Sequence, residues 1–290
     1  VALSISSAKR GYLAASLTYR LGLNVLSSYS AERAVYRGVQ DASAAIRYFR
    51  EHHEEYGIDF DNIYLWGSSA GSFIGLHLIY MEENERPIST YGSGSDPDLG
   101  CIDCEGNDYE HYSYPNALVS CWGAIGDLNW INQNNTIPLI MFHGSSDTVV
   151  PYNSGFPFTI DLFLPLVYGS NLIHERLNTL NIQNEFHGEP NLPHEYWGTS
   201  NGTWSDGPNE YFNIIKEDAY SFLFDVLYPF QLGDANNDGL INLFDVSHLI
   251  SVIIYENDYS VDPYYYDLNF DSEINIFDII ILADNILDLQ

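Results

Sequence analysis

The chain has 290 residues, 46% of them hydrophobic and 15% aromatic, which is enough for a packed core and for more than one domain. Its formal net charge of -30 at pH 7 argues against a nucleic-acid partner, because a polyanion would be repelled. No run approaches the roughly 20 consecutive apolar residues that a membrane helix needs, so we expect no membrane span.

The N-terminal stretch reads as the middle of a helix that leads into a strand. Residues 12–20 form an apolar run that predicts a buried strand. Residues 31–56 carry apolar side chains at helical spacing, including Val35, Val39 and Ile46, and predict a long helix. No signal-peptide pattern opens the chain, so we expect it to be a fragment or a processed product.

Strands and helices then alternate as far as residue 228. The predicted strands are 63–68, 116–125, 137–146 and 181–187, and the predicted helices are 69–81, a part of 161–180, and 209–228. This alternation predicts an α/β fold with a parallel sheet.

Two long insertions, residues 82–115 and 188–208, interrupt the regular elements, and such insertions often contact substrates. The first contains Cys101 and Cys104, and Cys121 follows it. Too few ligands lie nearby for a zinc site, and the pair lies in a loop rather than between a strand and a helix. We therefore expect a disulfide within the pair or from Cys104 to Cys121, with buried free thiols as the alternative.

Ser69 lies in a Gly-x-Ser-x-Gly sequence that follows a predicted strand and opens a predicted helix. A nucleophilic serine in this context occupies a strained turn, and Gly67 and Gly71 give the room that the turn needs. The new helix points its first amides toward the reaction centre, so the backbone N–H of Ala70 is a predicted oxyanion donor.

A serine needs a general base, and the base needs an acid that orients it. With a nucleophile elbow, the order along the chain is Ser, then Asp or Glu, then His. Asp147 and His194 each follow a predicted strand in that order, and we predict them as the acid and the base. Asp127 is the alternative acid. We expect His143 to pack or hydrogen-bond beside the acid's loop and His187 to be structural.

As a set, these segments resemble the α/β-hydrolase carboxylesterases: "GIDFDNIYLWGSSAG", "HGSSDTVVP", "PHEYWG", and "GYLAASLTYRLG" as the strand after the oxyanion segment. The resemblance covers about residues 1–228. It implies Ser69 as nucleophile, Asp147 as acid and His194 as base, with no cofactor for catalysis. It also implies a second oxyanion donor, which we expect upstream of Val1, so that the sheet is N-terminally truncated here.

The composition changes near residue 230. Residues 231–290 contain 12 Asp and Glu and no Lys or Arg. The chain has 40 acidic and 10 basic residues in all, so residues 1–230 hold 40 − 12 = 28 acidic and 10 basic side chains, a net of −18. We therefore predict two domains, residues 1–230 and residues 231–290.

The second domain contains two twelve-residue segments, 234–245 and 267–278, with oxygen-bearing side chains at the positions that bind Ca²⁺ in paired calcium loops. The predicted ligands are Asp234, Asn236, Asp238, the carbonyl of Leu240, Asn242 and Asp245 in the first loop, and Asp267, Asn269, Asp271, the carbonyl of Glu273, Asn275 and Asp278 in the second. Position 6 must turn sharply, and it is Gly239 in the first loop but Ser272 in the second, which predicts a weaker second site.

An apolar helix is predicted after each loop, and "INLFD" is repeated as "INIFD". This small all-α module resembles a type I dockerin over about residues 232–290. The resemblance implies two Ca²⁺ ions and a cohesin-type scaffold as partner. In dockerins, partner choice is set at positions 10 and 11 of each loop. In this chain these positions are Leu243-Phe244 and Ile276-Phe277, which either form a docking face or belong to the core. The alternative is a calcium module that packs on the esterase.

Together these features predict a secreted serine esterase that acts on carboxylic esters, such as acyl or feruloyl groups on plant cell-wall polysaccharide. Another hydrolase on the same fold, such as a lipase, a polyesterase or a peptidase, is one alternative. A non-catalytic binding protein that retains the fold is the other.

Overall fold

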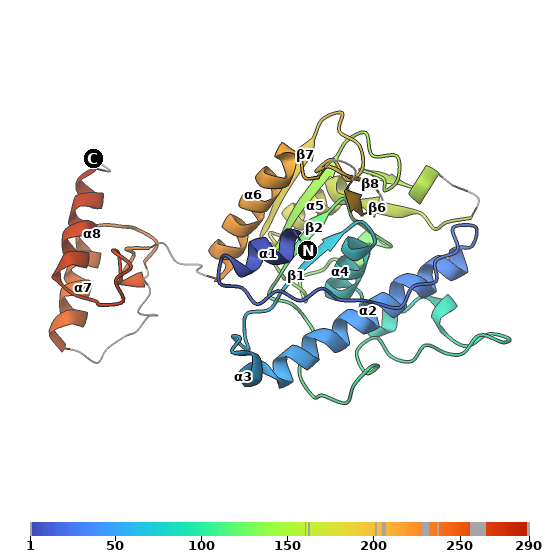
Figure 1. Cartoon of the computed structure of the whole chain (residues 1–290), viewed down its shortest axis with the longest axis horizontal. Helices are drawn as coiled ribbons and strands as arrows, with labels where there is room; N and C mark the ends of the chain where they lie inside the picture. The colour runs from blue at the N-terminus through green and yellow to red at the C-terminus, as the bar shows by residue number, and fades with distance from the viewer. Residues whose placement is uncertain are drawn as a thin grey trace. The chain divides into compact units, whose positions relative to one another are not determined.

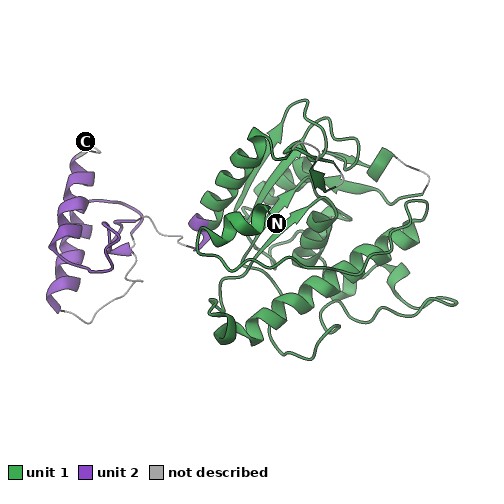
Figure 2. Ribbon diagram, in the orientation of Figure 1, with its two compact units in different colours: residues 1–223 green, residues 224–290 purple. Residues whose placement is uncertain are grey.

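The computed structural model describes residues 2–159, 161, 163–200, 202–204, 207–227, 232–236, 238–255 and 265–288. The chain forms two compact units, Val1–Leu223 and Phe224–Gln290 (Figure 2). The predicted boundary between residues 230 and 231 lies outside the described residues, so the division at that point stays a prediction.

Unit 1 is built on a four-stranded parallel sheet in the order β1-β2-β4-β7 (Figure 1). Its strands are β1 (Tyr64–Ser68), β2 (Ala117–Cys121), β4 (Leu139–Gly144) and β7 (Asn184–Glu189). Each of the four predicted strands after residue 60 overlaps one of these strands, and the α/β-hydrolase fold class is confirmed. Since the strands are parallel, their carboxyl ends meet at one edge of the sheet, where ligand sites of open α/β sheets lie.

Helices cover both faces of the sheet, among them α2 (Ser28–Glu51), α4 (Ala70–Tyr80) and α6 (Glu210–Leu227) (Figure 1). The helix α4 lies between α2 and the sheet, because it contacts α2 as well as β1 and β2. Successive side chains of β1 point to opposite faces. Leu65 packs in the core under α4, while the ring of Trp66 meets Tyr220 of α6 edge-on at 5.7 Å.

The remaining elements follow the expected order, and the predicted helices are confirmed. The helices are α1 (Ala2–Ala8), α2 (Ser28–Glu51), α3 (His53–Tyr56), α4 (Ala70–Tyr80), α5 (Ser170–Thr179), α6 (Glu210–Leu227), α7 (Leu243–Tyr255) and α8 (Ile276–Asp288). The 3₁₀ helices are Glu83–Glu85, Ile88–Thr90, Leu128–Trp130 and Pro157–Thr159. Short antiparallel strands are β3 (Ala124–Ile125), β5 (Ser154–Gly155), β6 (Val167–Gly169), β8 (Thr199–Ser200) and β9 (Thr203–Trp204).

The strand predicted for residues 12–20 is wrong, because this segment is irregular. Its leucines are not buried, with Leu13 48% and Leu17 42% exposed. The segment is fixed to α2 instead, where the backbone N–H and Nε of Arg20 donate to Asp41 at 2.6 and 2.8 Å. An apolar run becomes a strand only where a neighbouring strand pairs its backbone, and periodicity cannot report that neighbour.

The strand predicted for residues 116–125 is divided in two. Trp122 has φ 44, and this left-handed conformation ends β2 and directs the chain into β3. The short strand β3 pairs with β6 rather than with the main sheet. The backbone turn at Trp122 thus divides into two strands, in two different sheets, a segment that the apolar pattern predicted as one strand.

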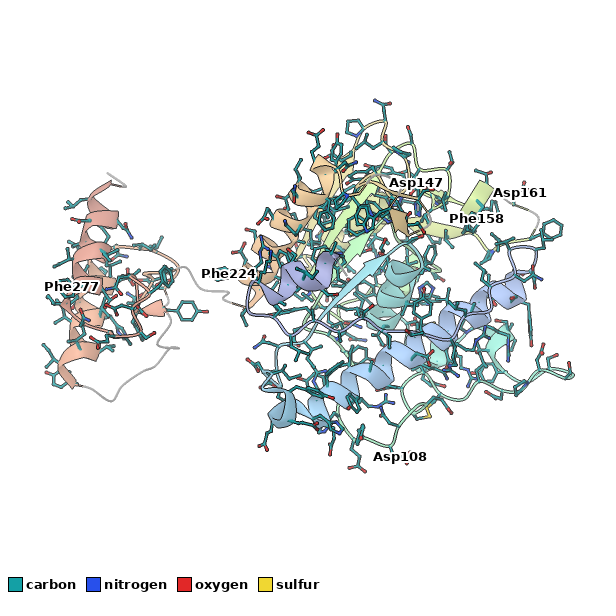
Figure 3. All side chains as sticks on the ribbon, in the orientation of Figure 1. Asp108, Asp147, Phe158, Asp161, Phe224 and Phe277 are labelled. Carbon is teal, nitrogen blue, oxygen red and sulfur yellow. A yellow bond between two sulfur atoms is a disulfide. The ribbon has the colours of Figure 1, made fainter. Side chains whose placement is uncertain are left out.

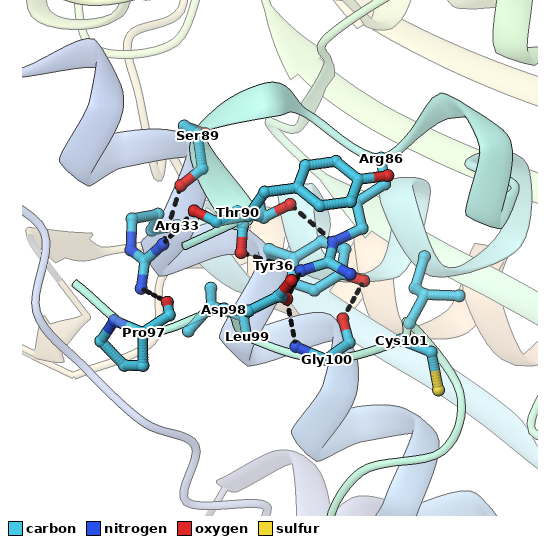
Figure 4. Close-up of polar contacts among 12 residues, drawn as sticks. Arg33, Tyr36, Arg86, Ser89, Thr90, Pro97, Asp98, Leu99, Gly100 and Cys101 are labelled. Atoms are coloured by element: carbon cyan, nitrogen blue, oxygen red, sulfur yellow. Dashed lines mark hydrogen bonds and ion pairs between the residues drawn. The ribbon is translucent and has the colours of Figure 1, made fainter. Parts of the chain in front are cut away.

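The insertion after α4 is held against α2 by arginine side chains. Arg33 donates to the carbonyls of Ser89 at 2.8 Å and Pro97 at 2.7 Å, and Figure 4 shows these contacts. The disulfide joins Cys101 to Cys104 in the same insertion. Cys121 is a buried free thiol, so the pairing from Cys104 to Cys121 is absent.

Arg47 of α2 makes several polar contacts with the insertion after α4. Its side chain is 2% exposed, pairs with the Asp103 carboxylate, and donates to the carbonyls of Asp103 and Glu105, each at 2.8 Å. Backbone carbonyls buried without a donor are costly, so these bonds stabilise an insertion that has few regular hydrogen bonds of its own.

We expect Arg47→Met to lower the free energy of unfolding of unit 1 by about 1–3 kcal/mol, because carbonyls of the insertion lose their donors. Urea unfolding monitored by tryptophan fluorescence measures the change. Arg37→Met is the matched control on the same helix, because Arg37 makes only one long bond, 3.4 Å to the Leu21 carbonyl. Equal losses for both variants would contradict the role given to Arg47.

Candidate active site

Ser69 lies on a strained turn between β1 and α4. Its φ of 52° and ψ of -113° are unusual for a residue with a side chain. A Cβ at Gly67 would approach the backbone of Gly71 and Ser72 to 2.5 Å, so only glycine fits there. A Cβ at Gly71, in contrast, would meet nothing within 4 Å. The close approach that sequence analysis assigned to both glycines therefore involves Gly67 alone.

The fully buried side chain of Ser72 holds the turn in place. Its hydroxyl lies 2.8 Å from the Gly67 carbonyl and 2.9 Å from the Cys121 carbonyl, so it bridges β1 and β2. The backbone N–H of Ser69 also donates to Cys121, at 3.0 Å. Ala70 follows as the first residue of α4, and the first amides of a helix have no intrahelical acceptor.

The structure brings the three predicted side chains together. Ser69 Oγ lies 2.9 Å from Nε2 of His194, and Nδ1 of His194 lies 2.6 Å from Oδ2 of Asp147. The serine follows β1, the aspartate follows β4 and the histidine follows β7, so three strand ends supply them. Asp147 is fully buried, and the His194 side chain is 10% exposed.

The Asp147 carboxylate accepts three hydrogen bonds and has a fourth close contact, to His143. Oδ1 accepts from the backbone N–H groups of Val149 and Val150, each at 2.8 Å. Oδ2 accepts from His194 and lies 3.2 Å from Nε2 of His143. Burial by itself would raise the pKa of Asp147, but the bonds from His143, His194 and Val150 outweigh it and hold this pKa well below its ordinary value.

Aromatic rings fix the position of the His194 loop. Trp122 is fully buried, and its ring meets those of His194, Tyr196 and Trp197 edge-on at 6.2, 5.0 and 4.9 Å. Its indole N–H donates to Ser68 Oγ at 3.0 Å, beside the nucleophile. Trp122 therefore connects the elbow to the histidine loop by packing and by one hydrogen bond.

Sequence analysis missed Glu195, the residue after the base. Glu195 has φ 51 and is 4% exposed, and both its carboxylate oxygens accept from the backbone N–H of Gly202, at 3.0 and 2.9 Å. This contact closes the loop that carries His194. A left-handed glutamate has no sequence signature, so only the folded loop identifies it.

The alternative residues have other partners. Asp127 caps a 3₁₀ helix and accepts from the backbone N–H of Asn129 at 2.8 Å. His187 lies 2.6 Å from Glu185 and 3.6 Å from Asp218, which agrees with a structural role.

A cavity of about 380 Å³ opens beside Asp147. Figure 3 labels Asp147, Phe158 and Asp161 at this end of unit 1. The cavity is lined by Asp147, Thr148, Pro151, Gly155, Phe156, Thr159 and Asp161. The lining carries acidic but no basic side chains, which favours a ligand without negative charge.

The first predicted calcium loop is closed by hydrogen bonds to two buried carboxylates. Asp234 is 1% exposed and accepts from the backbone N–H groups of Asp238 at 3.0 Å and Gly239 at 2.7 Å. Asp245 is fully buried and accepts from Asn242 at 2.7 Å. Gly239 has φ 82, which is the sharp turn that position 6 requires.

The second loop repeats this geometry. Asp267 accepts from the backbone N–H groups of Asp271 at 3.1 Å and Ser272 at 2.7 Å, and Asp278 is fully buried. Ser272 has φ 67, so a residue with a side chain takes the left-handed turn that glycine takes in the first loop. The strain at Ser272 supports the prediction of a weaker second site.

The donors present fit a calcium ion. Buried carboxylates need a compensating charge, and residues 231–290 contain no Lys or Arg to supply it. Among the described residues no three His, Cys, Asp or Glu side chains are arranged to hold a metal ion by themselves. Asparagine oxygens and one backbone carbonyl per loop complete the predicted set, and Ca²⁺ accepts such mixed oxygen ligands.

The apolar pairs of the two loops are exposed. Leu243 and Phe244 are each 73% exposed, and Ile276 and Phe277 are 57% and 60% exposed. The core of unit 2 is formed by other residues, among them Leu249, Val252, Tyr266, Leu282 and Ile286. Of the two alternatives for these pairs, a core position is therefore excluded.

Two family matches cover most of the chain. Residues 2–119 match the BD-FAE family of esterase-like α/β hydrolases, and residues 232–287 match the dockerin type I domain. No curated protein matches the chain. None of the helices that the structure describes has the length and apolar character of a membrane span.

Solved structures similar to this chain include esterase 2 of Thermogutta terrifontis. Its form phosphorylated by paraoxon is 20% identical with a TM-score of 0.46, and the match covers 72% of this chain and 68% of that chain. Its form phosphoramylated by tabun is 19% identical with a TM-score of 0.48 and covers 72% and 69%.

We expect Gly67→Ala to destabilise unit 1 by about 1–3 kcal/mol or more, because the new Cβ meets backbone atoms at 2.5 Å. Gly71→Ala is the matched control, and we expect it to be neutral or stabilising by up to about 1 kcal/mol, as alanine suits a helix better. Thermal unfolding of both variants measures the difference. A Gly67→Ala protein as stable as Gly71→Ala would refute this account of the elbow.

Proposed function

Since the chain combines a BD-FAE region on an α/β-hydrolase fold with a type I dockerin domain, we propose that it is a serine esterase tethered through the dockerin. The observation that carries the proposal is the continuous hydrogen-bonded line from Ser69 through His194 to Asp147, with distances of 2.9 and 2.6 Å. The ends of three strands supply these residues. Acyl transfer needs this arrangement of a nucleophile, a base and an acid that orients the base.

In the proposed mechanism, Nε2 of His194 takes the hydroxyl proton of Ser69 as Oγ attacks the ester carbonyl carbon. The imidazolium then gives this proton to the leaving alkoxide, and the alcohol departs. Water attacks the acyl carbon while His194 accepts its proton, and the imidazolium returns this proton to Ser69 Oγ as the acyl–Oγ bond breaks, which gives the carboxylic acid and free Ser69. Asp147 stays ionised throughout, holds the imidazole in one tautomer and stabilises its positive charge.

The oxyanion forms next to the first turn of α4. The backbone N–H of Ala70 is free of an intrahelical partner, and the positive end of the helix dipole favours negative charge there. The second donor that the esterase resemblance implies stays a prediction.

We place the substrate among uncharged acyl or feruloyl esters on plant cell-wall polysaccharide. The BD-FAE match and the dockerin support this class. A lipase, a polyesterase or a peptidase on this fold would use the same three residues, and substrate comparison separates them.

The dockerin domain supports calcium binding and a cohesin partner. We assign one Ca²⁺ to each loop and the docking face to the exposed pairs Leu243-Phe244 and Ile276-Phe277. Dockerin-containing proteins are typically extracellular or on the cell surface, and we propose the same location for this protein.

We expect Ser69→Ala to lower kcat on a short-chain p-nitrophenyl ester by about 10⁴-fold or more, because the attacking oxygen is lost. Steady-state kinetics measures the change, and Ser95→Ala serves as the control because Ser95 is an exposed serine of the insertion after α4. Methyl ferulate and acetylated xylan, assayed in parallel, identify the acyl class. Undiminished turnover in Ser69→Ala would exclude Ser69 as the nucleophile, and an inactive native protein would favour the binding-protein alternative.

For the dockerin we expect two calcium sites in isothermal titration calorimetry of the full chain. The double variant Asp234→Ala with Asp267→Ala removes the first ligand of each loop and should abolish the heat. Asp284→Ala is the control, because this aspartate is exposed on α8 outside both loops. Heat that persists in the double variant would count against both sites. Pull-down with a cohesin, with and without a chelator, tests the docking face.

A further inference from the structure

A second histidine contacts Asp147 at the same carboxylate oxygen as the base. His143 is fully buried at the end of β4, and its Nε2 lies 3.2 Å from Oδ2 of Asp147. Oδ2 is also the oxygen that accepts from His194 at 2.6 Å. The two imidazoles therefore share one carboxylate oxygen, and the mechanism above makes no use of His143.

The surroundings of His143 determine where its ring proton lies. Nε2 faces Oδ2 of Asp147 and the carbonyl of Val150, both at 3.2 Å, and neither oxygen carries a hydrogen. Nε2 must therefore be the protonated nitrogen. Nδ1 lies 2.8 Å from the hydroxyl of Ser170, the first residue of α5, and accepts its proton. The Ser170 hydroxyl has a second, longer acceptor in the Gly123 carbonyl at 3.4 Å.

We infer that His143 is a positioning residue for the esterase reaction, so that the line of polar contacts is not three residues long but five: Ser170, His143, Asp147, His194 and Ser69. This inference rests on the proposed function, since it assigns to Asp147 the role of orienting acid. Ser170 fixes the tautomer of His143, and His143 fixes the carboxylate of Asp147.

The physical effect of His143 is on the plane and the charge of the Asp147 carboxylate. The two valine amides hold Oδ1, and without His143 only the bond to His194 would hold Oδ2. The contact of His143 with Oδ2 holds the carboxylate in its plane while His194 moves a proton between Ser69 and the leaving group. Because a bond to a charged group contributes about 1.5–3 kcal/mol, its loss predicts a decrease in kcat of about 10- to 100-fold.

Packing supports a fixed His143 ring. The ring of Tyr152 meets it edge-on at 5.6 Å, and Ser170 is as fully buried as the histidine. None of these groups reaches the nucleophile, so His143 acts through Asp147 and not on the substrate. We therefore expect its removal to lower kcat and to leave KM unchanged.

The test compares four variants of the full chain by steady-state kinetics on the p-nitrophenyl ester. His143→Phe keeps a ring and removes the donor, while His143→Gln keeps a donor nitrogen at the position of Nε2. Ser170→Ala removes only the hydroxyl that fixes the tautomer. His77→Phe is the matched control, because His77 is a buried histidine of α4 that hydrogen-bonds the Phe73 carbonyl at 2.7 Å and not Asp147.

We expect a 10- to 100-fold lower kcat with unchanged KM in His143→Phe, a smaller loss in Ser170→Ala, recovery toward the native rate in His143→Gln, and none of these losses in His77→Phe. Native kcat in both His143→Phe and Ser170→Ala would overturn the inference. So would equal losses in His143→Phe and His143→Gln, which would mean that only the packing of the ring matters.

A spectroscopic measurement separates this inference from the proposed function. The Nδ1–H of His194 in its short bond to Asp147 should give a downfield ¹H NMR signal, and His143→Phe should move it while His143→Gln restores it. An unmoved signal would overturn the inference even in an active enzyme. Native protein without ester turnover would refute the proposed function, whereas the signal would still report whether His143 acts on the Asp147 to His194 bond.

Discussion

The geometry of the candidate site depends on one buried charge, the carboxylate of Asp147. An ionised group with no solvent exposure is tolerated only when donors surround it, and here two backbone amides and two histidines do so. These groups come from three segments of the chain. The turn after β4 supplies the amides, the end of β4 supplies His143, and the loop after β7 supplies His194. Moving any of these elements would remove at least one of the contacts that stabilise the charge.

The elbow at Ser69 is the second constraint, and it depends on packing rather than on charge. The left-handed turn costs energy of order 1–3 kcal/mol, which the surrounding contacts must offset. The Ser72 hydroxyl ties the turn to β1 and β2, and Gly67 lets the backbone of α4 approach. Trp122 then links the elbow to the histidine loop, so the distance from nucleophile to base is fixed by a packed side chain.

The dockerin loops also bury carboxylates, but the charge of these carboxylates is stabilised in a different way. Asp234, Asp245 and Asp278 are buried carboxylates that accept backbone amides, as Asp147 does. Among the described residues of unit 2 no histidine donates to them, and residues 231–290 contain no Lys or Arg to neutralise them. A divalent cation is the group that balances such a charge. In one protein, therefore, buried carboxylates are stabilised by imidazoles in one unit and suit calcium in the other.

The sequence by itself determined the parallel α/β arrangement, the helices, the dockerin repeat and the order of Ser69, Asp147 and His194, because local periodicity and short motifs encode these features. It failed at residues 12–20, where an apolar run has no strand to pair with, and at Trp122, where one left-handed residue divides a strand. Only the tertiary structure decided which cysteines pair, how Arg47 holds the insertion, and that Glu195 closes the base's loop. It also revealed Ser170 beside His143, and the contact of His143 with Asp147, where the sequence predicted only that His143 lies beside the acid's loop. These contacts join residues far apart in the chain, and sequence spacing carries no information about which of them meet.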